Sequence, residues 1–261
     1  MSETRDYQPG YSALHPEVTN PASRQRKAET AIFVVSNHLG RPPAGETVLD
    51  VGGSSGLMAE AFARLGCTVT AIDIDASAIE LAQQRPEVAG LQFRVGDAMA
   101  LDFANGSVDL VLCCHGYEHV PDAARMIAEI HRVLKPGGLC YFTAGNRLCW
   151  NEPHYNLPLL STLPRALAHL YLRLLGRGNY YHEKHLSYWG LKTLVKSFSV
   201  HDVTLEIVMH PLRFGTAYMV RPGSLKQRAA EAVLRFIPWA SPGYIWLLEK
   251  QRDGRAEFQN H

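Results

Sequence analysis

The strongest constraint on the fold is an apolar run that ends in a glycine-rich turn, VLDVGGSSG at residues 48–56. A helical pattern of apolar residues follows at 57–65. Glycines let a backbone approach a ligand closely, and the first turn of a helix offers unpaired N–H groups to an anionic group. The stretch therefore predicts a strand, a ligand-binding turn and a helix, in that order.

Similar alternation continues along the chain. Further apolar runs of strand length lie at 67–73, 91–95, 108–114, 139–144, 200–209 and 243–250, and helical patterns lie at 76–85, 122–134, 164–175, 188–198 and 224–236. Nearly continuous apolar strands that alternate with helices indicate a parallel sheet covered on both faces. The sequence predicts an α/β, Rossmann-like fold with a mostly parallel seven-stranded sheet and an inserted cap after the fifth strand.

The sequence predicts three parts of the chain. Residues 1–45 are predicted to form an N-terminal arm and a helix, which starts at Asn20-Pro21. Residues 46–261 form the main domain, with 145–187 as the cap, rich in proline, leucine and aromatic residues. Residues 145–200 carry seven Lys and Arg against two Asp and Glu. Such an excess fits a solvated face and a site for an anionic group equally well.

The bulk properties exclude some classes of protein. A net charge of +1 gives no global field that would attract nucleic acid. The five cysteines show no disulfide framework, which fits a reducing compartment. The chain shows no apolar segment typical of a signal peptide or a membrane span. These features predict a cytoplasmic protein with no transmembrane segment and no nucleic-acid partner.

Polar residues follow the predicted strands at regular places. Asp73 ends the second strand, where a carboxylate can accept hydrogen bonds from both hydroxyls of a ribose; Asp75 is more plausibly a helix cap. Gly96-Asp97-Ala98 follows the third strand, and the fourth ends at Cys113-Cys114-His115. The sequences EHVPD at 118–122 and RVLKPGG at 132–138 complete the pattern.

In this order, the motifs resemble those of class I S-adenosylmethionine-dependent methyltransferases. EHVPD and RVLKPGG are similar to the methyltransferases of ubiquinone and menaquinone biosynthesis and their type-11 relatives. The resemblance covers residues 46–145, although Ser54 replaces the central glycine of the family's first motif, D/E-x-G-x-G-x-G. It implies S-adenosylmethionine as the cofactor, and it implies the cofactor-binding residues Asp50, Gly52, Gly53, Ser54, Gly56, Asp73, Ile74, Asp97, Ala98 and Cys114.

The roles implied by the resemblance differ between these residues. In the family, the acid at the place of Asp50 orients the turn, the one at Asp73 binds the ribose, and the one at Asp97 receives the adenine amino group. The residues alone allow simpler roles, because Asp73 can serve as a helix cap and Asp97 as a turn residue. Arg24 and Arg26 are candidates for the cofactor's carboxylate, and Tyr7 and Tyr11 are candidates for a lid.

Catalysis of methyl transfer depends mainly on alignment, and a general base is needed only where the acceptor must lose a proton. His115 is the first candidate for that base, because it follows the fourth strand at the carboxyl edge of the sheet. His119 is the second candidate, and the histidine of EHV is structural in many relatives. His182 and His185, where the cap rejoins the core, are candidates for contact with the substrate.

A metal is the alternative use of the same residues. His115, Glu118 and His119 resemble a Glu-x-x-Glu-His pattern of the ubiquinone O-methyltransferases that looks like a divalent-ion site. His115 replaces the first glutamate and softens the ligand set, which does not suit Mg²⁺. We therefore predict no metal site.

The cap is expected to select the substrate. Trp150, Pro153, His154, Tyr155 and a leucine-rich helix are expected to wall an apolar pocket, and the arginines Arg147, Arg165, Arg173 and Arg177 are placed to meet an anionic group. A leucine stripe is also typical of packed core. We predict transfer to a hydroxyl of a small natural-product, sugar or lipid-linked metabolite.

Three other functions are compatible with parts of the sequence. A protein or nucleic-acid methyltransferase is disfavoured by the balanced charge and by Cys114-His115-Gly116-Tyr117, which is not the Asn/Asp-Pro-Pro-Tyr/Phe type of amino-methylating enzymes. A non-catalytic module for peripheral membrane contact or protein interaction is suggested by the basic, leucine-rich helix. A nicotinamide oxidoreductase is disfavoured because the spacing G-x-G-x-x-G is not met from Gly52.

Overall fold

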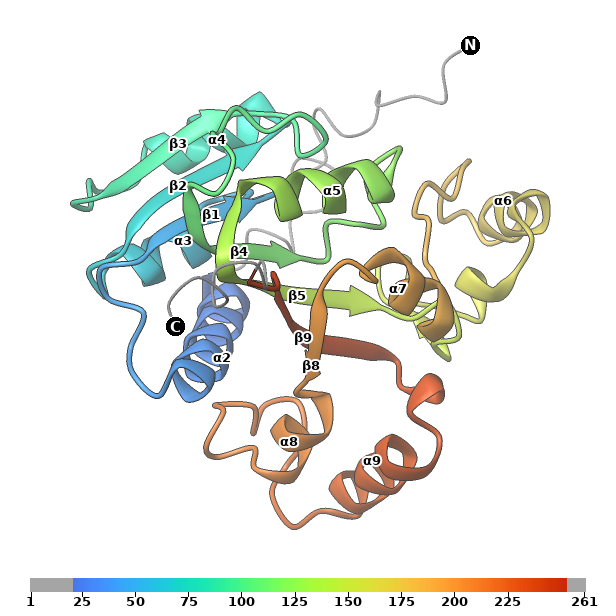
Figure 1. Cartoon of the computed structure of the whole chain (residues 1–261). Coiled ribbons are helices and arrows are strands. Elements are labelled where there is room, and N and C mark those ends of the chain that lie inside the picture. The colour runs from blue at the N-terminus through green and yellow to red at the C-terminus, as the bar shows by residue number, and fades with distance from the viewer. Residues whose placement is uncertain (1–20, 253–261) are drawn as a thin grey trace, which may run out of the picture.

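A central sheet of seven strands, with the order β3-β2-β1-β4-β5-β9-β8, organises the computed structural model, which describes residues 21–252 (Figure 1). Its strands are β1 (Thr47–Val51), β2 (Thr68–Asp73), β3 (Leu91–Val95), β4 (Val108–Cys114), β5 (Leu134–Gly145), β8 (Ser199–Asp202) and β9 (Gly243–Glu249). The strands from β3 to β5 pair in parallel, and β9 is antiparallel to both β5 and β8. The predicted α/β class and mostly parallel sheet are confirmed.

Helices cover both faces of this sheet. The helices of the described residues are α2 (Pro21–Leu39), α3 (Leu57–Ala63), α4 (Ala76–Gln83), α5 (Ala123–Val133), α6 (Arg165–Leu174), α7 (Tyr188–Leu194), α8 (Thr204–Met209) and α9 (Leu225–Phe236). Helix α6 lies apart from the sheet in the segment predicted as a cap, and α9 packs on α8. The start predicted at Asn20 and the lid candidates Tyr7 and Tyr11 lie outside the described residues. Within the described part of the chain, no helix is long and apolar enough to span a membrane.

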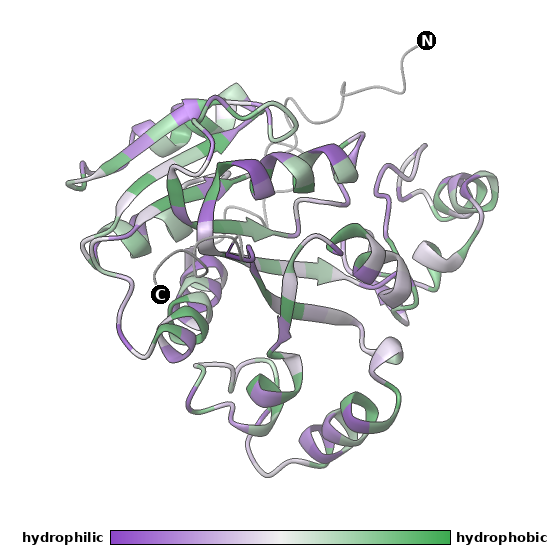
Figure 2. Cartoon of the chain, viewed as in Figure 1, coloured by the Kyte–Doolittle hydropathy of each residue, from purple (hydrophilic) through white to green (hydrophobic). Residues whose placement is uncertain are grey.

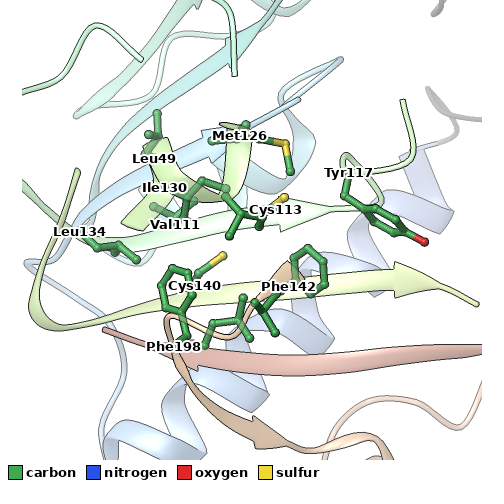
Figure 3. Close-up of a cluster of buried hydrophobic side chains, with 14 of the residues drawn as sticks. Leu49, Val111, Cys113, Tyr117, Met126, Ile130, Leu134, Cys140, Phe142 and Phe198 are labelled. Atoms are coloured by element: carbon green, nitrogen blue, oxygen red, sulfur yellow. The ribbon is translucent and has the colours of Figure 1, made fainter. Parts of the chain in front are cut away.

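Alternate residues of the central strands enter two separate cores. Val111 and Cys113 of β4 join a cluster with α5 and α7, whereas Leu110 and Leu112 join a cluster with α2 and α3. Figure 3 shows part of the first cluster, with Phe142 and Cys140 of β5 beside Phe198. The helices are amphipathic accordingly, and Figure 2 shows hydrophilic residues along one side of α5. Burial on both faces explains why these strands are apolar almost throughout.

The strand predicted at 200–209 is only partly correct. Strand β8 ends at Asp202, and α8 begins at Thr204. The Asp202 carboxylate accepts a hydrogen bond from Thr204 N at 3.0 Å, which turns the chain out of the sheet. Thr204 Oγ1 also accepts a hydrogen bond from Ile245 N at 3.0 Å. Tertiary contacts with β9 thus override the β-branched character of this segment.

The segment predicted as a cap has a small core of its own. It contains a hairpin of β6 (Asn151–Glu152) and β7 (Leu157–Pro158), a 3-10 turn at Leu160–Thr162, and α6. Its buried residues are Leu157, Leu160, Ala168, Leu172 and Tyr181. The stripe predicted for this segment comprises Leu163, Ala166, Leu167, Leu170, Tyr171 and Leu174. Leu163 and Tyr171 pack partly buried against this core, whereas Leu167, Leu170 and Leu174 are exposed. The division into arm, main domain and cap remains a prediction.

Candidate active site

The turn after β1 has an unusual backbone that its sequence explains. Gly52 and Gly56 have φ of 73° and 75°, values that favour glycine. Ser54 has φ 48°, so it takes the left-handed conformation without being glycine. The N–H groups of Gly52 and Gly53 donate to Ile72 O at 2.9 and 3.0 Å. These bonds fix the turn against the end of β2.

Asp50 lies beneath this turn. Its side chain is buried, and Oδ2 has no hydrogen-bond partner among the described residues. Burial raises the pKa of Asp50 to about 7, with the Arg24 charge opposing the shift and Asp73 adding to it. A Cβ at Gly53 would lie 3.2 Å from Oδ2, so the turn closes directly over the carboxyl group.

Asp73 and Asp75 separate clearly in their contacts. Asp73 accepts hydrogen bonds from the N–H of Ser54 and of Asp75, both at 2.9 Å. Asp75 is the N-cap of α4 and accepts from Ser77 N at 3.1 Å. Burial raises the pKa of Asp73, and these backbone bonds oppose the shift. The helix cap considered for Asp73 is therefore supplied by Asp75, and Asp73 joins the ends of β1 and β2.

A cavity of about 790 Å³ opens over the carboxyl ends of β1, β2 and β4. This size is typical of a cofactor site. Of the predicted cofactor-binding residues, Gly52, Ser54, Asp73, Ile74, Asp97, Ala98 and Cys114 line it. Asp50, Gly53 and Gly56 do not line it and instead shape the turn. The structure thus brings the dispersed motifs to one edge of the sheet.

Several residues around the cavity were not among the sequence predictions. Ser23 and Lys27 of α2 line it together with Arg24, which the sequence had suggested. Burial and the neighbouring Arg24 charge lower the pKa of Lys27. Residues Ser241–Ile245, which lead into and begin β9, also line the cavity. Among these cavity residues, only the basic residues of α2 were signalled by the sequence, and nothing in it pointed to the residues before β9.

Asp97 combines a turn with its place in the cavity. Its Oδ1 accepts a hydrogen bond from Met99 N at 3.0 Å, as a turn residue does. It also lines the cavity beside Ala98. The two readings of Asp97 are therefore compatible.

Both histidines predicted as bases line the cavity. His115 has φ 54°, and its Nδ1 lies 3.3 Å from Glu118 Oε1, within reach of an ion pair but not aligned as a hydrogen bond. Burial would raise the pKa of Glu118, but His115, His119 and His185 outweigh it and hold that pKa near 2. Burial lowers the pKa of His119 to about 3. The charge of Glu118 opposes this shift, and the nearby histidines add to it. His119 is therefore neutral and a weak proton acceptor.

The cap contributes a third histidine that was expected only as an apolar wall. His154 lines the cavity, and its ring packs edge-on against His119 with centroids 5.0 Å apart. Its Nδ1 lies 2.6 Å from Glu152 Oε1. His185 Nε2 lies 3.3 Å from the same oxygen, and the carbonyl of His182 accepts a hydrogen bond from Arg165. Neither His182 nor His185 lines the cavity.

Alanine should destabilise the fold more at Gly56 than at Gly52. At Gly56, a Cβ would clash with Phe93 Cε1, so Gly56→Ala should destabilise the fold by more than the roughly 1–2 kcal/mol of a left-handed residue. At Gly52, no described atom lies within 4 Å of the Cβ position. Gly52→Ala should therefore lower the free energy of unfolding only by the cost of the left-handed backbone. Urea unfolding measures both, and equal losses would contradict the clash with Phe93.

Asp50 should make stability depend on pH. Its pKa is raised from 3.8 to about 7 in the folded state, so the folded chain retains a proton that the unfolded chain has released. This group therefore lowers stability as pH rises from about 4 to about 7. Asparagine does not titrate, so the Asp50→Asn variant should lack this contribution. Between pH 5 and pH 8, the free energy of unfolding should therefore fall less in Asp50→Asn than in the wild-type protein, by about 1 kcal/mol or more.

Urea unfolding of both proteins at these two pH values checks this prediction. Asp109→Asn is a matched control, because its pairing with Lys135 lowers the pKa of Asp109, and its effect lies below this pH range. A pH slope that is the same in Asp50→Asn and in the unchanged protein would contradict the buried-carboxyl argument.

The fold, the turn and the cavity define a nucleotide-type cofactor site of the methyltransferase class. A family model described as "Methyltransferase domain" matches residues 49–142. The chain is 32% identical over 175 residues to a ubiquinone biosynthesis O-methyltransferase of Pseudomonas entomophila, covering 65% of this chain and 71% of that protein. A protein of the same name from Thiobacillus denitrificans is 36% identical over 146 residues, covering 55% and 59%.

The solved structure of the plantazolicin methyltransferase BpumL has the same fold, with a TM-score of 0.60 and 18% identity over 92% of this chain and 89% of that one. The chain belongs to the S-adenosylmethionine-dependent methyltransferases, in the family that includes the ubiquinone biosynthesis O-methyltransferases. S-adenosylmethionine is the cofactor of this class. The chain spans only 59% of the Thiobacillus denitrificans protein and 45% of a protein of the same name from Albidiferax ferrireducens.

Proposed function

We propose that this chain transfers a methyl group from S-adenosylmethionine to a hydroxyl group of a small molecule. The observation that carries the proposal is that one cavity joins the cofactor motifs of β1, β2 and β4 to His115, His119 and the cap residue His154. Oxygen as the acceptor atom is supported by the relatives, which are named O-methyltransferases.

The residues around the cavity suit this cofactor. The carboxylates of Asp73 and Asp97 supply acceptors for a nucleoside, and Gly52 lets the backbone of the turn approach it closely. We propose that Asp73 holds the ribose, that Asp97, Ala98 and Ile74 hold the adenine side, and that Cys114 contacts the cofactor between them and the acceptor.

The charged groups of the site have separate proposed roles. Arg24 and Lys27 supply positive charge for the cofactor's carboxylate, and both line the cavity. Asp50 holds the turn in shape from below, together with Gly53 and Gly56. The bound cofactor supplies a methyl group on a sulfonium, which is attacked in line by the acceptor. The chain's own residues contribute alignment and exclusion of water.

The acceptor is proposed to be a hydroxylated natural product, sugar or lipid-linked metabolite with an apolar part. The cavity wall includes Met126, Ile207, Val208, Val233 and Leu234, which would contact such a part. His115 and His119 are proposed to contact its polar end, from the loop after β4.

The experiment begins with calorimetric titration of the purified protein with S-adenosylmethionine, S-adenosylhomocysteine and NADH. Micromolar binding of the two sulfur compounds and none of NADH is expected. Transfer of a labelled methyl group is then measured into small-molecule, protein and nucleic-acid fractions. Label in the small-molecule fraction supports the proposal, and label confined to protein or nucleic acid would overturn it.

A further inference from the structure

The cap places a buried carboxylate behind one histidine of the cavity. Glu152 ends strand β6, and His154 follows in the turn that leads to β7. His185 comes from the segment that joins α6 to α7, 33 residues further along. These residues meet the loop after β4, where His119 lies against His154. Segments distant in sequence thus meet around His154, which lines the cavity together with His119.

Glu152 is arranged to hold imidazole rings. Its side chain is fully buried. Oε1 lies 2.6 Å from His154 Nδ1 and 3.3 Å from His185 Nε2, and Oε2 accepts a hydrogen bond from Tyr155 N at 2.9 Å. Burial would raise the pKa of Glu152, but the bonds to His154 and His185 outweigh it and hold that pKa near 2. Glu152 is therefore a carboxylate at any ordinary pH.

An ionised Glu152 fixes the tautomer of His154. A carboxylate only accepts hydrogen bonds, so Nδ1 of His154 carries the proton in the bond to Oε1. In the neutral ring the other nitrogen, Nε2, is then the one that accepts. The same logic orients the histidine of hydrolytic triads, where a buried carboxylate also stabilises the imidazolium that forms.

The electrostatic surroundings favour His154 over its neighbours as a proton acceptor. Burial opposes protonation of His154, but the bond to Glu152 and the charges of Glu152, Glu183 and Glu118 outweigh it and raise its pKa. The rings of His119 and His185 also face it. His119 has the opposite balance, with a pKa near 3.

We infer that His154, oriented by Glu152, accepts the proton of the acceptor hydroxyl during methyl transfer. This inference rests on the proposed function. The acceptor oxygen forms a bond to the methyl carbon as the methyl–sulfur bond breaks, and the electron pair of that bond stays on sulfur. The hydroxyl proton passes to Nε2 of His154, so the positive charge lost from sulfur appears on the imidazolium. His154 is the catalytic residue and Glu152 is a positioning residue.

A spectroscopic test examines this arrangement without turnover. Nitrogen-15 spectra of the full chain with S-adenosylhomocysteine bound should show neutral His154 as the tautomer protonated on Nδ1. Glu152→Gln should lower the pH at which His154 takes up its second proton, because the negative charge is removed. A tautomer protonated on Nε2 would overturn the inference whether or not an acceptor is known.

A kinetic test uses phenol and 4-nitrophenol as probe acceptors. His154→Gln should lower kcat for phenol by about 10²- to 10⁴-fold, the usual contribution of a general base. Its effect on 4-nitrophenol, which ionises without help at mildly alkaline pH, should be small. Glu152→Gln should move the acid limb of the pH–rate profile for phenol to lower pH, which a purely structural role would not do.

Controls separate this inference from the proposed function and from misfolding. His210→Gln changes an exposed histidine at the end of α8 and should leave turnover unchanged. S-adenosylhomocysteine affinity should be the same in all variants. If the wild-type protein methylates neither probe nor any other hydroxylated compound, the proposed function is wrong. Full turnover of phenol by His154→Gln, or a stoichiometric metal bound to His154, overturns the inference alone.

Discussion

Replacing Phe142 by alanine should lower the free energy of unfolding by about 3–5 kcal/mol, the usual cost of removing a buried aromatic ring. Phe142 is fully buried in β5, with Cys113 of β4 on one side and Trp246 of β9 on the other. Its ring centroid lies 6.0 Å from that of Tyr117 and 6.2 Å from that of Trp246. Figure 3 labels Phe142 and Tyr117. These neighbours belong to rigid strands or buried loops, so the cavity left by the ring would not close easily.

Urea unfolding followed by circular dichroism measures this loss. Phe236→Ala is the matched control, because the same ring on α9 is 81% exposed. The control should change the free energy of unfolding by less than about 0.5 kcal/mol. A loss of similar size in both variants would show that the core around β5 does not depend on the packing of Phe142.

The sheet was predictable because its signals are local. Each apolar run, such as that ending at Asp50-Val51 or at Cys113-Cys114, is long enough for one strand and is bounded by a turn or a helix start. Parallel strands carry their loops to the same edge, so residues after β1, β2 and β4 had to meet there. The cavity lined by Ser54, Asp73 and Cys114 follows from that rule.

The end of the sheet was harder to predict because distant contacts decide it. Residues 203–208 are rich in β-branched and apolar side chains and favour a strand by propensity alone. The backbone instead turns at Asp202, and Thr204 bonds to Ile245 of β9, 41 residues away. A pattern within ten residues carries no trace of such a bond.

The cap carried the least information in its sequence. Glu152 looks like an ordinary polar residue in an irregular segment, and its complete burial depends on His154 and on His185 further along the chain. The apolar face predicted for helix α6 is not the buried one, because Ala168 and Leu172 are buried while Leu167 and Leu174 are exposed. Apolar periodicity predicts a face, but the neighbour that covers it comes from the fold.

Asp73→Ala should weaken the affinity for S-adenosylmethionine by about 1.5–3 kcal/mol, the range for hydrogen bonds to a charged group. This corresponds to roughly a 10- to 150-fold higher dissociation constant. Asp73 lines the cavity at the end of β2, and its bonds to Ser54 N and Asp75 N hold the carboxylate in place. A carboxylate has about four acceptor positions, so these bonds leave capacity for ribose hydroxyls.

Calorimetric titration measures this affinity, and Asp75→Ala is the informative comparison. Asp75 also lines the cavity, but its Oδ1 caps α4 through Ser77. Its loss should therefore cost about 1 kcal/mol of stability, as the loss of a helix cap does, with a smaller effect on affinity than Asp73→Ala. If the dissociation constant is unchanged in Asp73→Ala and raised in Asp75→Ala, the ribose is held by Asp75. The cap bond would then share its carboxylate with the cofactor, and the carboxylate of Asp73 would serve only to tie the turn after β1 to the start of α4.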